Sequence, residues 1–292
     1  MGFVGRWWNN PWRPPRILAA VTVLYLIWSL LPVLIAIVYS FNDGRSRSVW
    51  QGFSFRWYWG DPERSVWADS SLHTALFHTL WLGLIATLIT VPLGVAFALG
   101  IDRWRGRLPA GANFAMLLSF VIPETLLAVA LLFVVTTLST PLRQGTMAQI
   151  LGLVTFQLSY PVIIVRSRLL TIGKQYEEAA VDLGASQFGA VRRVLFPMLA
   201  PAMLASAVLV FADVIDDFVI VRYLSGTADT EPVSVKIYNT ARAAPTPALN
   251  ALATLLLLSS IVAVMIGFFV YRFLTRGEDK DSRGIGNFAG EL

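Results

Sequence analysis

Long apolar runs alternate with short polar segments along the whole chain. The apolar runs cover about residues 17–41, 74–101, 112–137, 147–165, 200–221 and 249–273. An α-helix needs about 20 mainly apolar residues to cross a bilayer, so each run predicts one membrane-spanning helix. The first run is too long to be the core of a signal peptide, which has about 7–15 residues. The pattern therefore predicts an all-α, polytopic membrane protein with six transmembrane helices.

This pattern divides the chain into a lead at residues 1–16, a six-helix domain at 17–273 and a charged tail at 274–292. Hydrophobic residues make up 56% of the chain and charged residues 14%, which is more apolar than an average soluble domain. The absence of cysteine excludes disulfides and thiolate metal sites. His73 and His78 match no metal-ligand spacing, so we expect interfacial histidines, no metal site and no catalytic residue.

Basic residues are divided unevenly between the polar segments. If both termini lie in the cytoplasm, the cytoplasmic segments carry 15 Lys and Arg and the outer segments carry 8. Lys and Arg are enriched in cytoplasmic loops, so this orientation is the expected one. It places the polar segment at 166–199 in the cytoplasm. The net charge of +5 comes from residues that flank apolar runs, which suits a membrane surface better than nucleic acid.

The first outer loop, residues 42–73, is rich in aromatic residues. It contains Trp50, Phe53, Phe55, Trp57, Tyr58, Trp59 and Trp67, and its acidic and basic residues balance. Aromatic side chains are enriched at membrane–water interfaces. We expect this loop to lie on the outer leaflet, with direct substrate contact as the alternative.

A polar insert at residues 176–197 separates the fourth and fifth apolar runs. Its first part, 176–183, consists of good helix formers, Gly184 can end that helix in a left-handed conformation, and Ser186 can cap a second short helix. In the second helix, Phe188, Val191 and Leu195 follow at helical spacing, which predicts one apolar face against a membrane or bundle. Pro197 can stand in the first turn of the next helix. The insert thus predicts a helix, a glycine turn and a helix.

Within this insert, Glu178-Ala179-Ala180, Gly184 and the final Val194-Leu195-Phe196-Pro197 keep a fixed spacing. This motif resembles the EAA loop of permease subunits of binding-protein-dependent ABC importers, and Phe196 is a departure from its usual ending. The resemblance implies a type I ABC importer permease fold with a coupling loop at about 169–199. In that family the loop docks on a cytoplasmic ATPase. The coupling residues implied here are Glu177, Glu178, Ala179, Ala180, Gly184 and Pro197.

Carboxylates lie within two of the predicted membrane helices. An Asp at the centre of a membrane helix costs about 2.5–3.5 kcal/mol on insertion scales, so these groups should face protein or water. Asp213, Asp216 and Asp217 have i, i+3, i+4 spacing, which predicts one helix side and a line of acceptors for a cationic substrate. Glu124 follows Pro123, whose helix break exposes backbone groups, so Glu124 could line the same pathway or bond locally. Pairing with basic residues, or neutral carboxyl groups, is the alternative.

A second resemblance covers nearly the whole chain. Asp216-Asp217-Phe218-Val219-Ile220, the segment 232–238 and the segment 247–254 are similar to the corresponding region of C-type permeases for spermidine and putrescine, and Pro123-Glu124 fits the same subgroup. The resemblance implies a polyamine substrate. Relatives that move other small amines, amino acids or opine-like solutes share much of the pattern, so these substrates stay open.

The chain has no Walker-type phosphate-binding loop, so ATP hydrolysis must come from another chain. The resemblance implies a homologous permease as heterodimer partner, two cytoplasmic ATPase subunits that use ATP and Mg, and an extracytoplasmic substrate-binding protein. It also implies the bacterial inner membrane as the location. This chain itself is expected to bind no cofactor and to catalyse no reaction. The alternative from another class is a secondary transporter.

Overall fold

The computed structural model describes residues 16–46, 49–104, 108–137, 143–243 and 246–275. The α-helices are α2 (Arg16–Ser40), α3 (Ser70–Arg103), α4 (Leu108–Val121), α5 (Glu124–Thr137), α6 (Thr146–Gln157), α7 (Ser159–Ile172), α8 (Gln175–Asp182), α9 (Gln187–Ala190), α10 (Phe196–Asp216), α11 (Val219–Leu224), α12 (Val233–Ala243) and α13 (Ala248–Thr275). Short helices of other types are η1 (Arg56–Gly60), η2 (Val191–Leu195) and η3 (Ala228–Thr230). The expectations for residues 1–15 and 276–292 lie outside the described residues.

Five helical segments are long and apolar enough to cross a membrane. They are Ile17–Ser40, Ser70–Arg103, Thr146–Ile172, Gln187–Asp216 and Ala248–Phe273. Together they confirm the all-α membrane fold. The third predicted span is represented instead by two shorter helices, α4 and α5.

The third predicted span, 112–137, is divided into two helices at Pro123. α4 ends at Val121 and α5 begins at Glu124, because Pro123 has no N–H to donate and disfavours helical backbone in the residue before it. The carbonyl of Pro123 accepts hydrogen bonds from Leu126 and Leu127 at 2.9 and 3.2 Å and opens α5. Glu124 consequently stands at a helix N-terminus, not in a helix interior.

The prediction of one helix over 200–221 is wrong. α10 ends at Asp216, Asp217 leaves the helix with ψ 134°, and α11 begins at Val219. Asp213 and Asp216 share a face of α10, whereas Asp217 lies beyond its end. The three aspartates do not form the single line that their spacing predicts.

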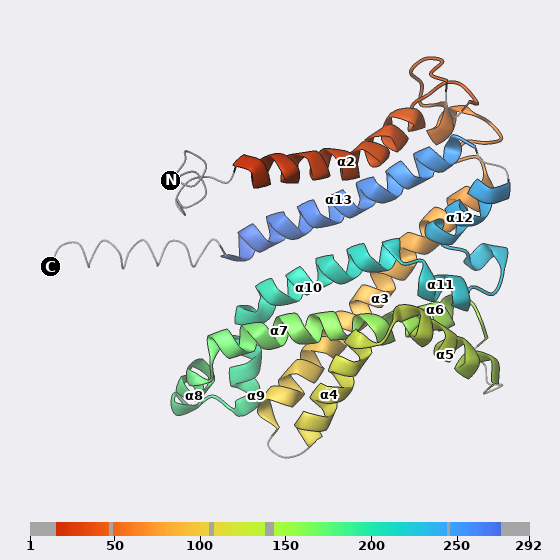
Figure 1. The fold of residues 1–292 in the computed structure, drawn as a ribbon. Helices are drawn as coiled ribbons and strands as arrows, with labels where there is room; N and C mark the ends of the chain where they lie inside the picture. The colour runs from red at the N-terminus through yellow and green to blue at the C-terminus, as the bar shows by residue number, and fades with distance from the viewer. Residues whose placement is uncertain (1–15, 47–48, 105–107, 138–142, 244–245, 276–292) are drawn as a thin grey trace, which may run out of the picture.

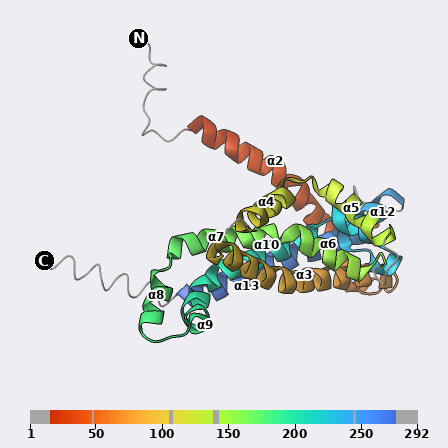
Figure 2. The same cartoon turned by 90° about the horizontal axis from the view of Figure 1, so that it is seen from below.

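The central helix of the bundle is α3, which packs against α10, α7 and α6 (Figure 1). Figures 1 and 2 show α8 and α9 at one end of the bundle, the insert end, and α5 and α12 at the other, the loop end. α2 packs against α13. The apolar stretches of these two helices are only 0% and 6% buried, which leaves broad apolar surfaces for lipid or another subunit.

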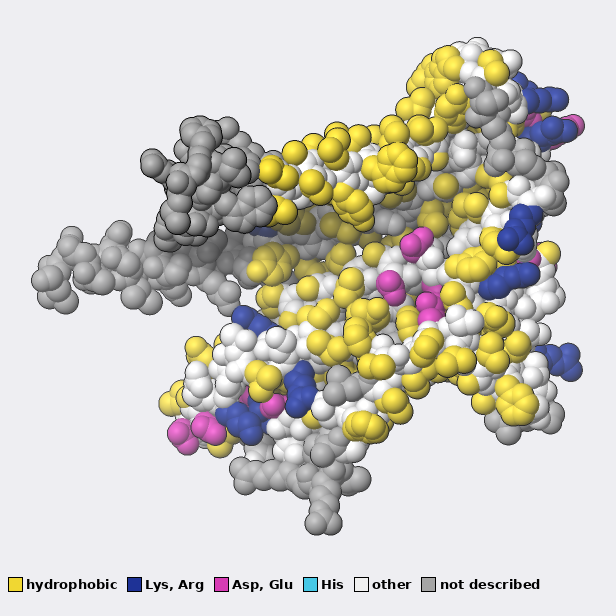
Figure 3. Space-filling model, in the orientation of Figure 1, with side chains coloured by type: hydrophobic (Ala, Val, Ile, Leu, Met, Phe, Trp, Pro, Cys, Tyr) yellow, Lys and Arg dark blue, Asp and Glu magenta, His cyan; other side chains and the backbone are white. Residues whose placement is uncertain are grey.

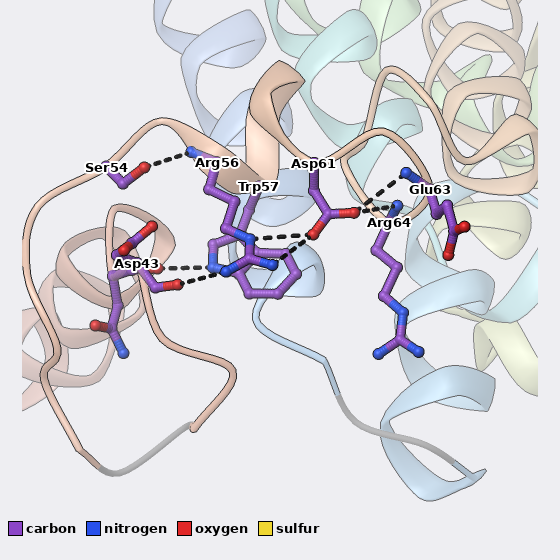
Figure 4. Close-up of polar contacts among 8 residues, drawn as sticks. Asp43, Ser54, Arg56, Trp57, Asp61, Glu63 and Arg64 are labelled. Carbon is purple, nitrogen blue, oxygen red and sulfur yellow. Dashed lines mark hydrogen bonds and ion pairs between the residues drawn. The ribbon is translucent and has the colours of Figure 1, made fainter.

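At the loop end, an ion pair organises the segment between α2 and α3. Arg56 donates from Nε and Nη2 to Oδ2 of Asp61 at 3.0 and 2.9 Å, while Asp61 Oδ1 accepts from the backbone N–H groups of Glu63 and Arg64 (Figure 4). The hydrogen bond from Glu63, helped by Arg56 and opposed by burial, holds the pKa of Asp61 below its ordinary value. This segment is a folded cap.

The aromatic residues of this loop divide into a buried and an exposed set. Trp57 and Tyr58 are buried in this cap, and Trp57 Nε1 donates to the carbonyl of Asn42 at 2.7 Å. Phe53, Trp59 and Trp67 remain exposed. Buried Trp needs a partner for its N–H, and the Asn42 carbonyl supplies it.

Candidate functional site

The two helix breaks bring carboxyl groups together from distant parts of the chain. Glu124 begins α5, Asp213 lies in the last turn of α10, and Asp217 follows the end of α10. Figure 3 shows acidic side chains grouped on a mostly hydrophobic face, over the region where α10 ends. We call Glu124, Asp213 and Asp217 the acidic cluster.

Asp217 is fixed by local bonds. Its Oδ1 accepts from the backbone N–H of Val221 at 3.1 Å, and its carbonyl oxygen accepts from Ser234 Oγ at 2.6 Å. The residue is only 9% exposed. A carboxylate that satisfies a free N–H in the first turn of a helix stabilises that helix, so Asp217 holds the start of α11 beside α12.

Asp213 is held by a different group. Gln157, the last residue of α6, donates from Nε2 to Asp213 Oδ2 at 2.5 Å. Gln157 is fully buried, and its Oε1 has no hydrogen-bond partner within the described ranges. A buried amide oxygen without a partner is costly, so the bond to Asp213 is the contact that holds the Gln157 amide in place.

The members of the acidic cluster act on one another. The carboxylates of Glu124 and Asp213 interact electrostatically with Asp217 and with the hydroxyl of Tyr160 on α7. Asp216 is exposed on α10, and its side chain makes no hydrogen bond or ion pair with the described part of the chain. None of these four acidic side chains is paired with Lys or Arg in the described residues. Uncompensated negative charge of this kind attracts a cation.

Sequence reasoning missed Gln157 and Tyr160. Both sit next to the junction of α6 and α7, where Leu158 separates the two helices, and their contacts with the cluster span long stretches of sequence. The only available signal was a polar glutamine inside an apolar run.

A hollow of about 850 Å³ lies near the cluster on the loop-end side, lined by Phe218, Arg222, Tyr223, Tyr238, Asn239 and Arg242.

The polar insert folds as its sequence predicts. α8 covers Gln175–Asp182, Gly184 takes φ +88°, and Ser186 Oγ accepts from the N–H of Gly189 to cap α9. Only glycine adopts such a positive φ at little cost, so the turn between α8 and α9 depends on Gly184. Pro197 stands in the first turn of α10.

The apolar positions of the insert divide into two groups. Leu195 is buried and Val191 packs beside it against the inner core of α3 and α7. Phe188, which was predicted on the same covered face, is instead 74% exposed, and Leu183 is 91% exposed. α9 is only four residues long and a π-helical turn follows it, so Phe188 does not share the buried position of Leu195. Two large apolar side chains therefore face away from the protein at the insert end.

The predicted coupling residues lie on α8 and its turn. Glu178 and Ala179 are exposed, Ala180 is half-buried, and Glu177 is directed into an ion pair with Arg103 at the end of α3. Glu177 and Glu178 also border a hollow of about 480 Å³ between α8 and the end of α3. No group of three or more His, Cys, Asp and Glu in the described residues is arranged to hold a metal ion.

Comparison with known proteins adds independent information. A family described as "Binding-protein-dependent transport system inner membrane component" matches residues 90–280. The chain is 30% identical over 283 residues to the putrescine transport system permease protein PotI of Escherichia coli K12, covering 95% of each chain. It is 32% identical over 264 residues to the spermidine/putrescine transport system permease protein PotC of the same strain, covering 89% of this chain and 96% of the relative.

Solved structures show the same fold. A bacterial ABC transporter involved in the import of the acidic polysaccharide alginate superposes with a TM-score of 0.70 at 16% identity, covering 89% of this chain and 95% of the other. The MetNI methionine ABC transporter gives a TM-score of 0.56 at 19% identity, covering 70% of this chain and 94% of the other. Similarity at this level of identity concerns architecture alone.

Proposed function

This chain belongs to the family of binding-protein-dependent transport system inner membrane components, and from that premise we propose that the solute it moves is a polyamine. The family makes it a permease subunit of an ABC importer, with no catalytic activity of its own. The family expected from the sequence is therefore confirmed, and so is the expected fold.

The observation that carries the substrate proposal is the acidic cluster. Glu124, Asp213 and Asp217 interact within a membrane domain and have no basic partner among the described residues. A polyamine carries several ammonium groups on an alkyl spacer, so closely grouped acceptors along an otherwise apolar pathway match its chemistry. The names of the relatives, which specify putrescine and spermidine, support the same class.

The carboxyl groups have separate roles in this proposal. Asp213 and Glu124 receive an ammonium group, and Gln157 positions the Asp213 carboxylate through its Nε2–H. The exposed Asp216 lies one turn further along α10 and contacts the solute as it passes. Asp217 holds the start of α11, and its Oδ1 is already used by the N–H of Val221.

The polar insert is proposed as the coupling segment. Leu183 and Phe188 present exposed apolar surface, and Glu178 and Ala179 are exposed beside them. Large apolar side chains on a polar surface mark a protein interaction site. We assign this surface to a cytoplasmic ATPase subunit, with Gly184 fixing the turn and Pro197 starting the helix that leads back to Asp213.

The remaining partners follow from the family. The complex is proposed to contain a homologous permease as heterodimer partner, two ATPase subunits that bind ATP and Mg, and an extracytoplasmic binding protein. Both termini and the insert end lie in the cytoplasm in this arrangement, in agreement with the distribution of Lys and Arg. The loop end, with its aromatic cap and α12, then faces the binding protein.

Transport of another small amine, an amino acid or an opine-like solute is the competing proposal for the substrate. An amino acid carries a carboxylate as well as an ammonium group, and the acidic cluster offers that carboxylate only repulsion. Family membership sets aside the secondary transporter that the sequence left open.

The test uses the complete complex, with its binding protein, in proteoliposomes that contain ATP. Uptake of labelled putrescine and spermidine is measured against uptake of a neutral amino acid. ATP-dependent polyamine uptake supports the proposal, and its absence from a complex that still hydrolyses ATP in response to its binding protein refutes the substrate. Deletion of Glu178 to Gly184 should stop uptake; uptake that survives this deletion refutes the coupling role of the insert.

A further inference from the structure

We propose that the ion pair between Arg103 and Glu177 is a second mechanical link between the coupling segment and the membrane helices, with Arg103 as a positioning residue for energy coupling. The inference rests on the proposed coupling role of the insert. It assigns a function to two side chains that lie 74 residues apart in the sequence.

α8 is weakly anchored by its own packing. It contributes no buried residue, and its helix contacts are mainly with α9 and η2, which belong to the same insert. Glycines with positive φ flank it on both sides, Gly173 at +72° and Gly184 at +88°. Turns of this kind do not themselves fix α8 against the membrane helices, so its orientation depends on a contact with another element.

Arg103 supplies that contact from the last turn of α3. Its Nη2 donates to Glu177 Oε1 in the first turn of α8, and its Nη1 donates to Asp102 Oδ2 at 2.5 Å. The side chains of Arg103, Asp102 and Glu177 are 27%, 15% and 16% exposed. Because solvent reaches them poorly, the attraction is screened less than in a surface pair. Glu178, the next residue, remains exposed and available to a partner protein.

α3 can carry a displacement from Arg103 to the acidic cluster. A Cβ on Gly83 would lie 2.6 Å from Ile215 Cγ2 of α10, and a Cβ on Gly94 would lie 2.5 Å from Pro161 Cγ of α7. At these two positions the helices touch with no spare space. Closely packed interiors transmit strain instead of absorbing it. Ile215 stands two residues from Asp213, and Pro161 follows Tyr160, so a movement of α3 reaches both.

The insert therefore has two routes into the membrane domain. One is the covalent path through α9 and η2 into α10, and the other is the Arg103–Glu177 pair into α3. With both intact, α3 and α10 move together when α8 is displaced. Without the ion pair, α8 acts on the membrane helices only through α9 and η2, and part of the displacement is lost as rotation of α8 about its two glycine turns.

The experiment compares variants of the complete complex in proteoliposomes by the amount of solute transported per ATP hydrolysed. Arg103→Gln and Glu177→Gln should each lower this ratio about fivefold or more, in the range of typical coupling energies between sites. Complex yield should stay unchanged. Exchange of the two charges, Arg103→Glu with Glu177→Arg, should restore most of the ratio. Arg143→Gln, at an exposed arginine outside the insert, is the matched control and should behave as wild type.

Wild-type ratios in both single variants would overturn the inference. Loss of complex yield in the single variants would show that the ion pair is only a structural contact, and so would failure of the charge exchange to restore coupling. Either result would also overturn the inference. If deletion of Glu178 to Gly184 also left uptake intact, the proposed function of the insert would fail with it. If that deletion stopped uptake while the Arg103 variants coupled normally, only the present inference would fail.

Discussion

Substitutions of Asp217 distinguish a structural role of its carboxylate from direct contact with the solute. Its Oδ1 accepts from the N–H of Val221 at 3.1 Å and opens α11. Asp217→Ala leaves that N–H without its partner, and loss of such a cap costs about 1 kcal/mol. For a chain of this size, 1 kcal/mol corresponds to about 2–4 °C in the melting temperature. Asp217→Asn keeps an oxygen acceptor and removes repulsion from Glu124 and Asp213, so its melting temperature should match wild type.

The assay is thermal unfolding of the purified complex in detergent, with polyamine uptake measured on the same preparations. Asp217→Ala should melt about 2–4 °C lower, whereas Asp217→Asn should keep both its melting temperature and most of its uptake. Equal melting temperatures for the Ala variant and the wild type would refute the capping role. An Asn variant with wild-type stability but with uptake as low as that of Asp213→Asn would show that Asp217 itself carries the solute.

Three further predictions concern packing, charge and backbone. Gly83→Ala should destabilise the complex by about 1–3 kcal/mol through overpacking against Ile215, while Gly100→Ala, whose Cβ meets open space, should be neutral or stabilising in the same thermal assay. The folded pKa of Asp61 lies below its ordinary value of 3.8, so the stabilisation by its carboxylate is complete above that value and is lost as the pH falls through the lowered pKa. Asp61→Asn should therefore remove this part of the acid dependence of the melting temperature. An unchanged dependence of the melting temperature on acid pH would contradict this prediction. Gly184→Val should impair coupling, since φ +88° is strained for a β-branched residue; normal transport per ATP would show that the turn tolerates rearrangement.

The sequence predicted the features that depend on local chemistry. Apolar runs of sufficient length located the membrane helices, and Gly184 with Ser186 predicted the turn and cap of the insert, because a left-handed glycine and an N-cap hydroxyl act on neighbouring backbone groups. The break before Glu124 has a local cause in Pro123, which removes a backbone N–H and disfavours helical backbone in the residue before it.

The remaining features depend on tertiary contacts. No proline or glycine marks the end of α10; the chain leaves the helix at Asp217, whose carboxylate then opens α11. Gln157 reaches Asp213 across 56 residues, a separation that no sequence period reveals. Phe188 was placed on one apolar face with Val191 and Leu195 because its spacing fits a long helix, and α9 is too short to continue that face.

The most direct test of the account is binding-protein-dependent uptake of labelled putrescine by the complete complex, with wild type compared with Asp213→Asn. ATP hydrolysis and melting temperature are recorded on the same samples. The account predicts that the variant assembles, melts as wild type and hydrolyses ATP, while its putrescine uptake falls about tenfold, the equivalent of about 1.4 kcal/mol. Wild-type putrescine uptake by Asp213→Asn would contradict the claim that the acidic cluster guides a cationic solute through this subunit.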